Sequence, residues 1–314
     1  MFKPLRLIRS GTKIPFAEFR LTAFTFSLLL IMGSILSLFA YGLNFGIDFR
    51  GGILMEVRSE KNVSISEIRT QLENLKLGEI NIQKFGKDTD ILIRIQRQDG
   101  AEKEQIAAIE LVKKTLGSTV DYRRTEFVGP TVGEELKEAG LLAIGLALLS
   151  ILIYIWMRFE WQFGIGALIA LTHDIITTIG LFAVLNYEFN LATVAAILTI
   201  AGYSINDTVV VYDRVRENLR KYKKLDLLSL FNMSINETLS RTTMTSVTTL
   251  LALFSIFFFG GAVLADFALA MIWGVCIGTY SSIFIAVPLL LYVNLKRGDE
   301  DESGLQAPQD EIPS

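Results

Sequence analysis

Six long apolar stretches limit most strongly how this chain can fold. Each holds about 20 mostly apolar residues, the length that an α-helix needs to cross about 30 Å of hydrocarbon. The stretches lie near residues 21–41, 139–157, 163–185, 191–212, 242–259 and 267–293. A mean hydropathy of +0.43 over 314 residues agrees with a chain that folds largely in lipid. The sequence therefore predicts an α-helical polytopic membrane protein with six transmembrane helices.

Basic residues predict the orientation of these spans. Lysine and arginine are concentrated in residues 1–20, at Arg158, in 213–241 and at 296–297, whereas the loops 186–190 and 260–266 contain neither. Because basic residues in short loops stay in the cytoplasm, we expect both termini on that side. The first stretch is too long for the core of a signal peptide, so we expect it to remain as an anchor. Residues 213–241 are expected to form a cytoplasmic loop, and 296–314 a disordered acidic tail.

The segment 42–137 is too long and too charged to be a loop. Its pattern is strand 53–59, helix 64–75, strand 79–85, strand 90–97, helix 102–116 and strand 119–127. Ser64 and Glu67 have the spacing of a capping box at the start of the first helix. This order of elements is typical of a ferredoxin-like α+β domain, which the topology places outside the cytoplasm. It contains no pair of nucleophile and base, so we expect binding there and no enzymatic activity.

Few ionisable residues lie within the predicted spans. An ionised group at the centre of a bilayer costs at least ~2.5–3.5 kcal/mol, so each one needs a reason. Asp174 lies near the middle of the third span, after His173, and Asp207 lies near the cytoplasmic end of the fourth. Arg241 opens the fifth span at a comparable depth, which makes it a candidate partner for Asp207. A buried carboxyl beside a movable arginine is a candidate proton switch.

Polar residues around these charges could support a proton path. Asn206 precedes Asp207, and a stripe of hydroxyl groups along the fifth span includes Thr242 and Thr245. Small hydroxylated residues also allow helices to pack closely in lipid, which is an equally simple explanation of the stripe. Likewise, Arg241 has an alternative explanation as an interfacial anchor, and His173 as a packing residue.

The composition excludes several kinds of protein. One cysteine and one histidine cannot build a disulfide framework or a Cys/His zinc site. A net charge of −3 gives no basic field for nucleic acid. We therefore expect no metal, no cofactor and no nucleic acid, with protons as the coupling ion.

Four motifs carry a resemblance to a known family. They are LNFGIDFRGG at 43–52, VGPTVGEEL at 128–136, GYSINDTVVVYDRVREN at 202–218 and ETLSRT at 237–242. Together with His173-Asp174 they resemble the signatures of SecF, the smaller partner of SecD in bacterial protein export. The resemblance extends from about residue 16 to residue 296. Tyr212 and Val215 stand where that family often has phenylalanine and isoleucine.

The resemblance implies a fold, a function and partners. It implies an RND-type half of six helices in the bacterial inner membrane, with SecD supplying the other half. It also implies work beside the SecYEG channel, with YajC, on an unfolded preprotein whose late movement is driven by the proton-motive force. Asp207 and Arg241 match the family residues associated with proton flow, and Asp174 is expected to position helices or hydrate the path.

Three other functions remain open from the sequence. A small-molecule exporter of the RND superfamily would share the proton machinery, although about ninety outer residues leave little room for a substrate pocket. An intramembrane aspartyl protease could use Asp174 and Asp207 as a pair sharing one proton, although its Gly-x-Gly-Asp motif is absent. A structural scaffold of the translocon would need no titrating group.

Four residues are candidate hinges of the outer domain. Gly51 and Gly52 precede its first strand, and Gly129 and Pro130 follow its last. Glycine's wide backbone freedom suits a hinge, but a tight turn is an equally good reason for it.

Overall fold

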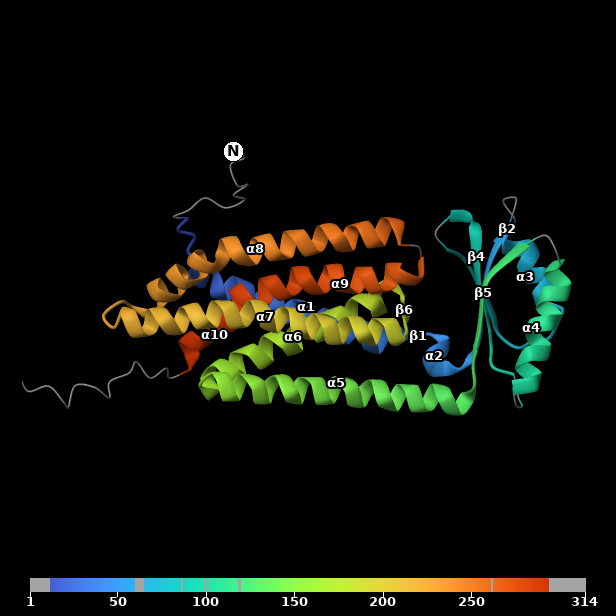
Figure 1. Cartoon of the computed structure of the whole chain (residues 1–314), viewed down its shortest axis with the longest axis horizontal. Coiled ribbons are helices and arrows are strands. Elements are labelled where there is room, and N and C mark those ends of the chain that lie inside the picture. The colour runs from blue at the N-terminus through green and yellow to red at the C-terminus, as the bar shows by residue number, and fades with distance from the viewer. Residues whose placement is uncertain are drawn as a thin grey trace, which may run out of the picture.

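The computed structural model consists of a helical bundle at one end and a small α+β domain at the other (Figure 1). It describes residues 12–59, 65–85, 87–98, 100, 102–117, 120–260 and 262–293. The predicted capping residue Ser64 and the tail 296–314 lie outside this part of the chain. Within it, six helices are long and apolar enough to cross a membrane, which confirms the predicted number of spans.

The bundle is built from helices that differ in how deeply they are buried. Its long helices are α1 (Arg20–Tyr41), α5 (Pro130–Arg158), α6 (Trp161–Leu185), α7 (Leu191–Lys221), α8 (Leu227–Phe259) and α9 (Ala262–Ser281). The chain enters the bundle through the short 3-10 helix η1 (Phe16–Phe19). Helices α6, α7 and α9 are the most buried, whereas α1, α5 and α8 expose rows of large apolar side chains. Three helices thus form the centre, and three surround it.

Residues 213–241, expected to form a cytoplasmic loop, are mostly helical, and their position in the cytoplasm stays a prediction. Helix α7 continues to Lys221 and α8 begins at Leu227, so only residues 222–226 connect them. Asp226 caps α8 by accepting a hydrogen bond from the Ser229 amide at 2.9 Å. Charged residues form helix here because they pair across the two helices, as the 2.6 Å contact of Arg214 with Glu237 illustrates.

The last span is not one continuous α-helix, as residues 267–293 were expected to be. After α9 it passes through a π-helical turn, η3 (Ser282–Ala286), then α10 (Val287–Leu289) and the 3-10 turn η4 (Leu290–Tyr292). Pro288 has no N–H to donate, which interrupts the regular backbone ladder in this region. The hydroxyl of Tyr212 on α7 donates to the Ala286 carbonyl at 3.0 Å.

The outer domain has the predicted ferredoxin-like topology. Its elements are β2 (Gly52–Ser59), α3 (Ile65–Glu73), β3 (Ile80–Phe85), β4 (Lys87–Ile95), α4 (Glu102–Leu116) and β5 (Val120–Val128). The sheet order is β3-β4-β2-β5 with antiparallel neighbours throughout. Alternate residues such as Ile53, Met55 and Ile93 are fully buried, and α3 and α4 cover the side of the sheet away from the bundle (Figure 1). The domain ends at Val128, because α5 begins at Pro130 and runs straight into the bundle.

A short segment that the sequence did not indicate joins the domain to the bundle. Strand β1 (Asn44–Phe45) pairs in parallel with β6 (Glu188–Phe189), and α2 (Ile47–Arg50) follows it. The Gly46 amide donates to the Phe189 carbonyl at 2.9 Å. Asp48 accepts a hydrogen bond from the Leu191 amide at 2.8 Å, at the start of α7. The connection from α1 to the sheet is therefore fastened to the outer end of the bundle.

Close packing of α1 on α6 gives a testable prediction. A Cβ added at Gly180 would lie 2.2 Å from the Ser34 Cβ and 2.6 Å from its Cα, so the helices would have to separate. We expect Gly180→Ala to lower the free energy of unfolding by about 1–3 kcal/mol, measured in mixed micelles. Gly33→Ala is the matched control, because its added Cβ meets nothing within 4 Å. Helix propensity should make the control neutral or stabilising by up to ~1 kcal/mol. Equal losses in the two variants would contradict the packing argument.

Candidate functional site

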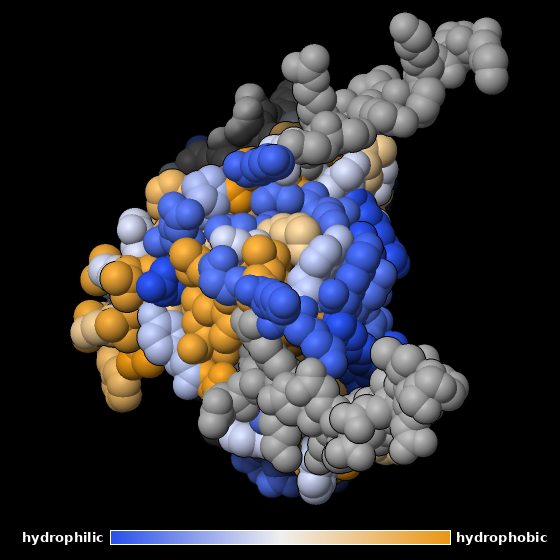
Figure 2. Space-filling model, turned by 90° about the vertical axis from the view of Figure 1, so that its left-hand side faces the viewer, coloured by the Kyte–Doolittle hydropathy of each residue, from blue (hydrophilic) through white to orange (hydrophobic). Residues whose placement is uncertain are grey.

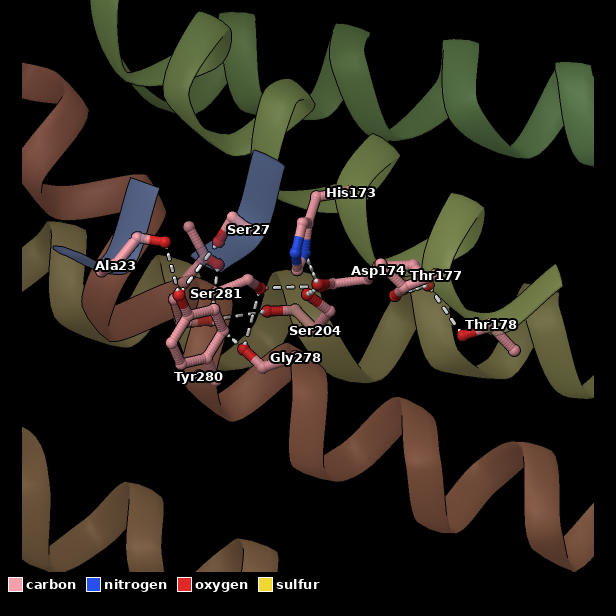
Figure 3. Close-up of polar contacts among 12 residues, drawn as sticks. Ala23, Ser27, His173, Asp174, Thr177, Thr178, Ser204, Gly278, Tyr280 and Ser281 are labelled. Carbon is pink, nitrogen blue, oxygen red and sulfur yellow. Dashed lines mark hydrogen bonds and ion pairs between the residues drawn. The ribbon is translucent and has the colours of Figure 1, made fainter. Parts of the chain in front are cut away.

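Asp174 lies at the centre of a buried polar cluster between α6, α7 and α9 (Figure 3). Its carboxylate is completely buried. The hydroxyls of Ser204 and Ser281 donate to Oδ2 at 2.6 and 2.8 Å, and His173 Nδ1 lies 3.0 Å from Oδ1. A carboxylate that accepts several hydrogen bonds is stabilised even in the bundle interior. Asp174 thus ties together the three central helices.

The two threonines that follow Asp174 do not contact its carboxylate. Thr177 and Thr178 lie three and four residues after Asp174 on α6, and their hydroxyls donate to the Asp174 backbone carbonyl at 3.1 and 2.7 Å. His173 is also buried, and its Nε2 has no hydrogen-bond partner among the described residues. His173 therefore has a polar role beside Asp174 in addition to packing.

Asp207 lies on α7, one helical turn beyond Ser204. It is buried, and its Oδ2 has no hydrogen-bond partner among the described residues. The Thr279 hydroxyl on α9 and the Arg241 guanidinium on α8 are the polar groups that act on this carboxyl. Thr279 is in turn bonded to Ser246 of α8 at 2.7 Å. This carboxyl is less completely satisfied than that of Asp174.

The predicted Asp207–Arg241 pair is not a direct contact. Within the described chain, Arg241 forms no ion pair within 4.0 Å, and its side chain is exposed on α8. The two groups interact electrostatically without a hydrogen bond. A long arginine side chain on an exposed helix face has room to approach or leave the carboxyl.

The predicted polar path differs in detail from the structure. The Thr245 hydroxyl donates to carbonyls of its own helix, at 2.9 Å for Thr242, and Thr242 Oγ1 is buried without a partner in the described part of the chain. Asn206 is exposed. The hydroxyl groups around the two acids come instead from residues that the sequence did not single out. Ser204 and Ser281 donate to Asp174, and Thr279, which is bonded to Ser246, acts on Asp207. The sequence did contain a signal for these residues, because each is a hydroxyl residue within an otherwise apolar helix.

A further hydroxyl contact lies between the two acids. Thr208 of α7 is bonded to Ser282 of the π-helical turn at 2.8 Å. Ser282 also approaches the Ser204 carbonyl at 3.4 Å. The site is therefore a small set of serines and threonines at the crossing of α7 with α9 and η3. In the described residues no bond joins Asp174 to Asp207, which argues against a proton-sharing protease dyad.

Two of the four candidate hinge residues, Gly51 and Gly52, must be glycine for steric reasons that are independent of any hinge motion. Gly51 and Gly52 have φ angles of +72° and +122°. A Cβ at Gly52 would lie 2.7 Å from the Ile95 carbonyl oxygen in the neighbouring strand. Gly129 has an ordinary extended conformation before Pro130, which begins α5. A hinge role for the four residues stays a prediction, and alanine at Gly52 would strain the sheet whether or not the domain moves.

One ion pair connects the sheet to the bundle. Arg94 of β4 binds Glu188 of β6, and both side chains are largely buried. Burial raises the pKa of Glu188 and neighbouring Asp48 adds to this, while Arg94 opposes the rise. Because one buried charge here compensates another, the position of the domain on the bundle depends on both residues.

Comparison with known proteins places these features in a family. Residues 108–296 match the family model described as protein export membrane protein SecD/SecF, C-terminal, and residues 36–63 match the SecD/SecF GG motif. The protein translocase subunit SecF of Rickettsia rickettsii is 46% identical, with 93% of this chain and 96% of the relative covered. That of Rickettsia prowazekii is 43% identical, with 93% and 95% covered.

Two solved structures resemble the whole fold. The crystal structure of SecDF, a translocon-associated membrane protein from Thermus thermophilus, is 37% identical with a TM-score of 0.82. The alignment covers 92% of this chain and 39% of that one. SecDF in its super-membrane-facing form gives a TM-score of 0.67 at 36% identity, covering 93% and 40%. The chain thus spans about two fifths of the solved SecDF chains.

Proposed function

This chain belongs to the SecF family of protein translocase subunits, and we propose that it couples proton movement across the bacterial inner membrane to protein export. Membership makes it a multi-pass membrane component of protein transport. The observation that supports proton coupling is the unequal environment of its two buried acids. Asp174 has partners on both oxygens, whereas Asp207 keeps one oxygen unpaired in the described structure and interacts with Arg241 only at a distance.

In this mechanism Asp207 is the residue that gains and loses the proton. An ionised carboxylate in apolar surroundings needs a compensating charge nearby. When Arg241 approaches, the ionised form is favoured, and when Arg241 withdraws, the protonated form is favoured. Asp174 holds α6 to α7 and α9, so a change at Asp207 can shift helices against a fixed centre. Two arrangements of these helices would then alternate with the protonation state.

The proposed partner is SecD, and an open polar face of the bundle supports it. Gly202, Asn206 and Arg241 are exposed within or at the edge of the spans. An added Cβ at Gly202 meets nothing within 4 Å. Polar groups in the membrane generally face protein or water, because exposure to lipid is costly. A second set of helices over this face would complete the site. The solved SecDF chain is longer than this one, since the alignment covers only 39% of it.

We also propose the surroundings in which this subunit works. Both termini lie in the cytoplasm and the α+β domain lies outside, where it meets an unfolded preprotein leaving the SecYEG channel, with YajC as an accessory. The clustering of basic residues at the end of α7, between α7 and α8 and at the end of α5 supports this orientation. No cofactor is needed, because the transported proton is itself the coupling ion.

The partner surface can be tested by co-purification of the tagged chain. We expect SecD and channel subunits to accompany it, and Gly202→Trp to reduce the recovery of SecD by filling the open face. Gly145→Trp on α5 is the matched control, since it also adds a side chain into open space. Undiminished SecD recovery with Gly202→Trp would place the partner elsewhere on the bundle. Recovery of an efflux partner in place of SecD would favour the exporter alternative.

A further inference from the structure

A basic pocket lies at the end of the bundle that we assign to the cytoplasm. It is lined by Arg158, Asp213, Arg216, Glu217, Arg220 and Lys221, and has a volume of about 380 Å³. We call it the basic pocket. Figure 2, which views this end of the molecule, shows hydrophilic residues next to apolar ones. The proposed coupling of protons to export gives these residues no role.

Exposed aromatic side chains indicate at which level of the membrane the basic pocket lies. Trp156 near the end of α5 and Trp161 at the start of α6 are 70% and 56% exposed. Exposed tryptophans gather at the level of the lipid headgroups, where their amphipathic rings are most stable. Arg158 lies between them, and Arg216 Nη1 reaches its carbonyl at 3.4 Å. The pocket therefore opens at the depth of the lipid phosphates.

The charges within the basic pocket do not cancel. Asp213 is paired with Arg158 at 3.0 Å, and Glu217 is paired with Arg214 at 2.6 Å. Three bases of the pocket have no carboxylate within ion-pair distance in the described part of the chain: Arg216, Arg220 and Lys221. Two guanidinium groups on successive turns of one helix suit the oxygens of a phosphate, which they can bind in a bidentate manner.

Apolar surface continues from the basic pocket along α5. Ile153, Trp156 and Met157 are exposed on this helix immediately before Arg158. A free phosphate ion would leave that surface unused, whereas the acyl chains of a phospholipid would cover it. Basic pockets between helices at the cytoplasmic side of a membrane are suited to anionic headgroups.

We propose that the basic pocket binds the headgroup phosphate of an anionic phospholipid, with the acyl chains lying along the exposed face of α5. Arg216 and Arg220 hold the phosphate, and Lys221 adds positive charge at the rim. Arg158 is kept in place by Asp213 and forms the floor. Because the pocket is lined by the end of α5 and by α7, the lipid stabilises the contact of a peripheral helix with a central one.

The test is native mass spectrometry of the purified full chain in detergent, titrated with phosphatidylglycerol. We expect the double variant Arg216→Gln/Arg220→Gln to weaken retention of this lipid by about tenfold or more. The double variant Lys223→Gln/Lys224→Gln removes the same charge from the connection between α7 and α8 and should retain it like the original protein. Equal weakening in both variants would overturn the proposal, because surface charge alone would then explain the attraction.

Two further arms separate the alternatives. Phosphatidylethanolamine, which has no net charge, should be retained at least about tenfold less than phosphatidylglycerol, and equal retention would overturn the proposal. Glycerol 3-phosphate should not compete at concentrations that match the lipid. If it binds as tightly as the lipid, the pocket is a site for a soluble phosphate instead. Thermal melting of each variant is compared first, and the exposed single variant Arg220→Gln replaces the double one if that variant is destabilised.

Discussion

Vesicles containing Asp207→Asn are expected to lose the part of protein export that a proton gradient stimulates. Asparagine has the shape of the protonated acid but cannot release a proton, so the bundle should remain in one arrangement. The loss should be complete for the stimulated component, while export driven by other energy sources continues. Asp207→Glu keeps a titratable group and should retain part of the stimulation. The measurement is export into inverted membrane vesicles with and without a proton gradient.

The control for this variant is Glu160→Gln, which removes one negative charge at the exposed end of α6. It should leave gradient-stimulated export unchanged, and SecD should co-purify equally with both variants. Continued stimulation in the Asp207→Asn vesicles would assign the coupling to another acid, most simply one in the partner subunit. Loss in the control as well would indicate a general effect of charge and would remove the argument for Asp207.

A second large effect is expected where the outer domain meets the bundle. Arg94→Gln leaves Glu188 largely buried without its partner and should cost about 3–5 kcal/mol of stability at neutral pH. Glu188→Gln should cost less, because the amide oxygen can still accept a hydrogen bond from the Arg94 guanidinium, which keeps its buried charge. The double variant should recover most of the loss from Arg94→Gln. Chemical unfolding in detergent measures these values, and hydrogen exchange at the Gly46 and Leu191 amides reports on the local contact.

The pH dependence of this contact follows from the raised pKa of Glu188, whose ordinary value is 4.5. Since the folded protein binds this proton more tightly than the unfolded chain, acidification stabilises the folded state relative to the unfolded one, although it weakens the ion pair itself. The contribution is fully present below pH 4.5 and is lost as the pH rises through the higher pKa of the folded state. Glu188→Gln should abolish this dependence.

The control for the ion pair is Arg97→Gln, which changes an exposed arginine just beyond the same strand. A surface substitution of this kind should stay within about ±0.5 kcal/mol. Equal destabilisation by Glu188→Gln and Arg94→Gln would contradict this prediction. The buried carboxylate would then not be the group whose loss of a partner sets the cost.

The sequence was sufficient for features that depend on local pattern. Hydropathy alone found six spans, since a helix in lipid must be apolar over its whole length. Isoleucine at every second position, Ile91, Ile93 and Ile95, agreed with the predicted strand 90–97 of the α+β domain, and these three side chains are buried in its core. Asp174 and Asp207 were found for the same reason, because acids are rare within such spans.

Features that depend on contacts between distant residues could not be obtained in this way. Arg94 and Glu188 are 94 positions apart, and each looks like an ordinary surface charge until the chain is folded. The helical residues of α7 and α8 that lie beyond the predicted spans were missed, because a hydropathy window detects apolar stretches and these residues are largely polar. Opposite charges three residues apart, as in Arg214 and Glu217, were a signal of helix that a search for spans ignores.

The π-helical turn in the last span has a consequence for how its residues are counted around the axis. A regular α-helix turns by about 100° per residue, so one additional residue in a turn shifts the phase of all residues after it. Ser281 and Ser282 are adjacent yet both fully buried, one bonded to Asp174 and the other to Thr208. The faces of the segment before Ser282 are therefore rotated about the helix axis relative to the faces of the segment after Ala286. A helical wheel drawn through both would assign the wrong faces to one of them. Deletion of a single residue in this turn would rotate residues 287–292 relative to Asp174 and Asp207.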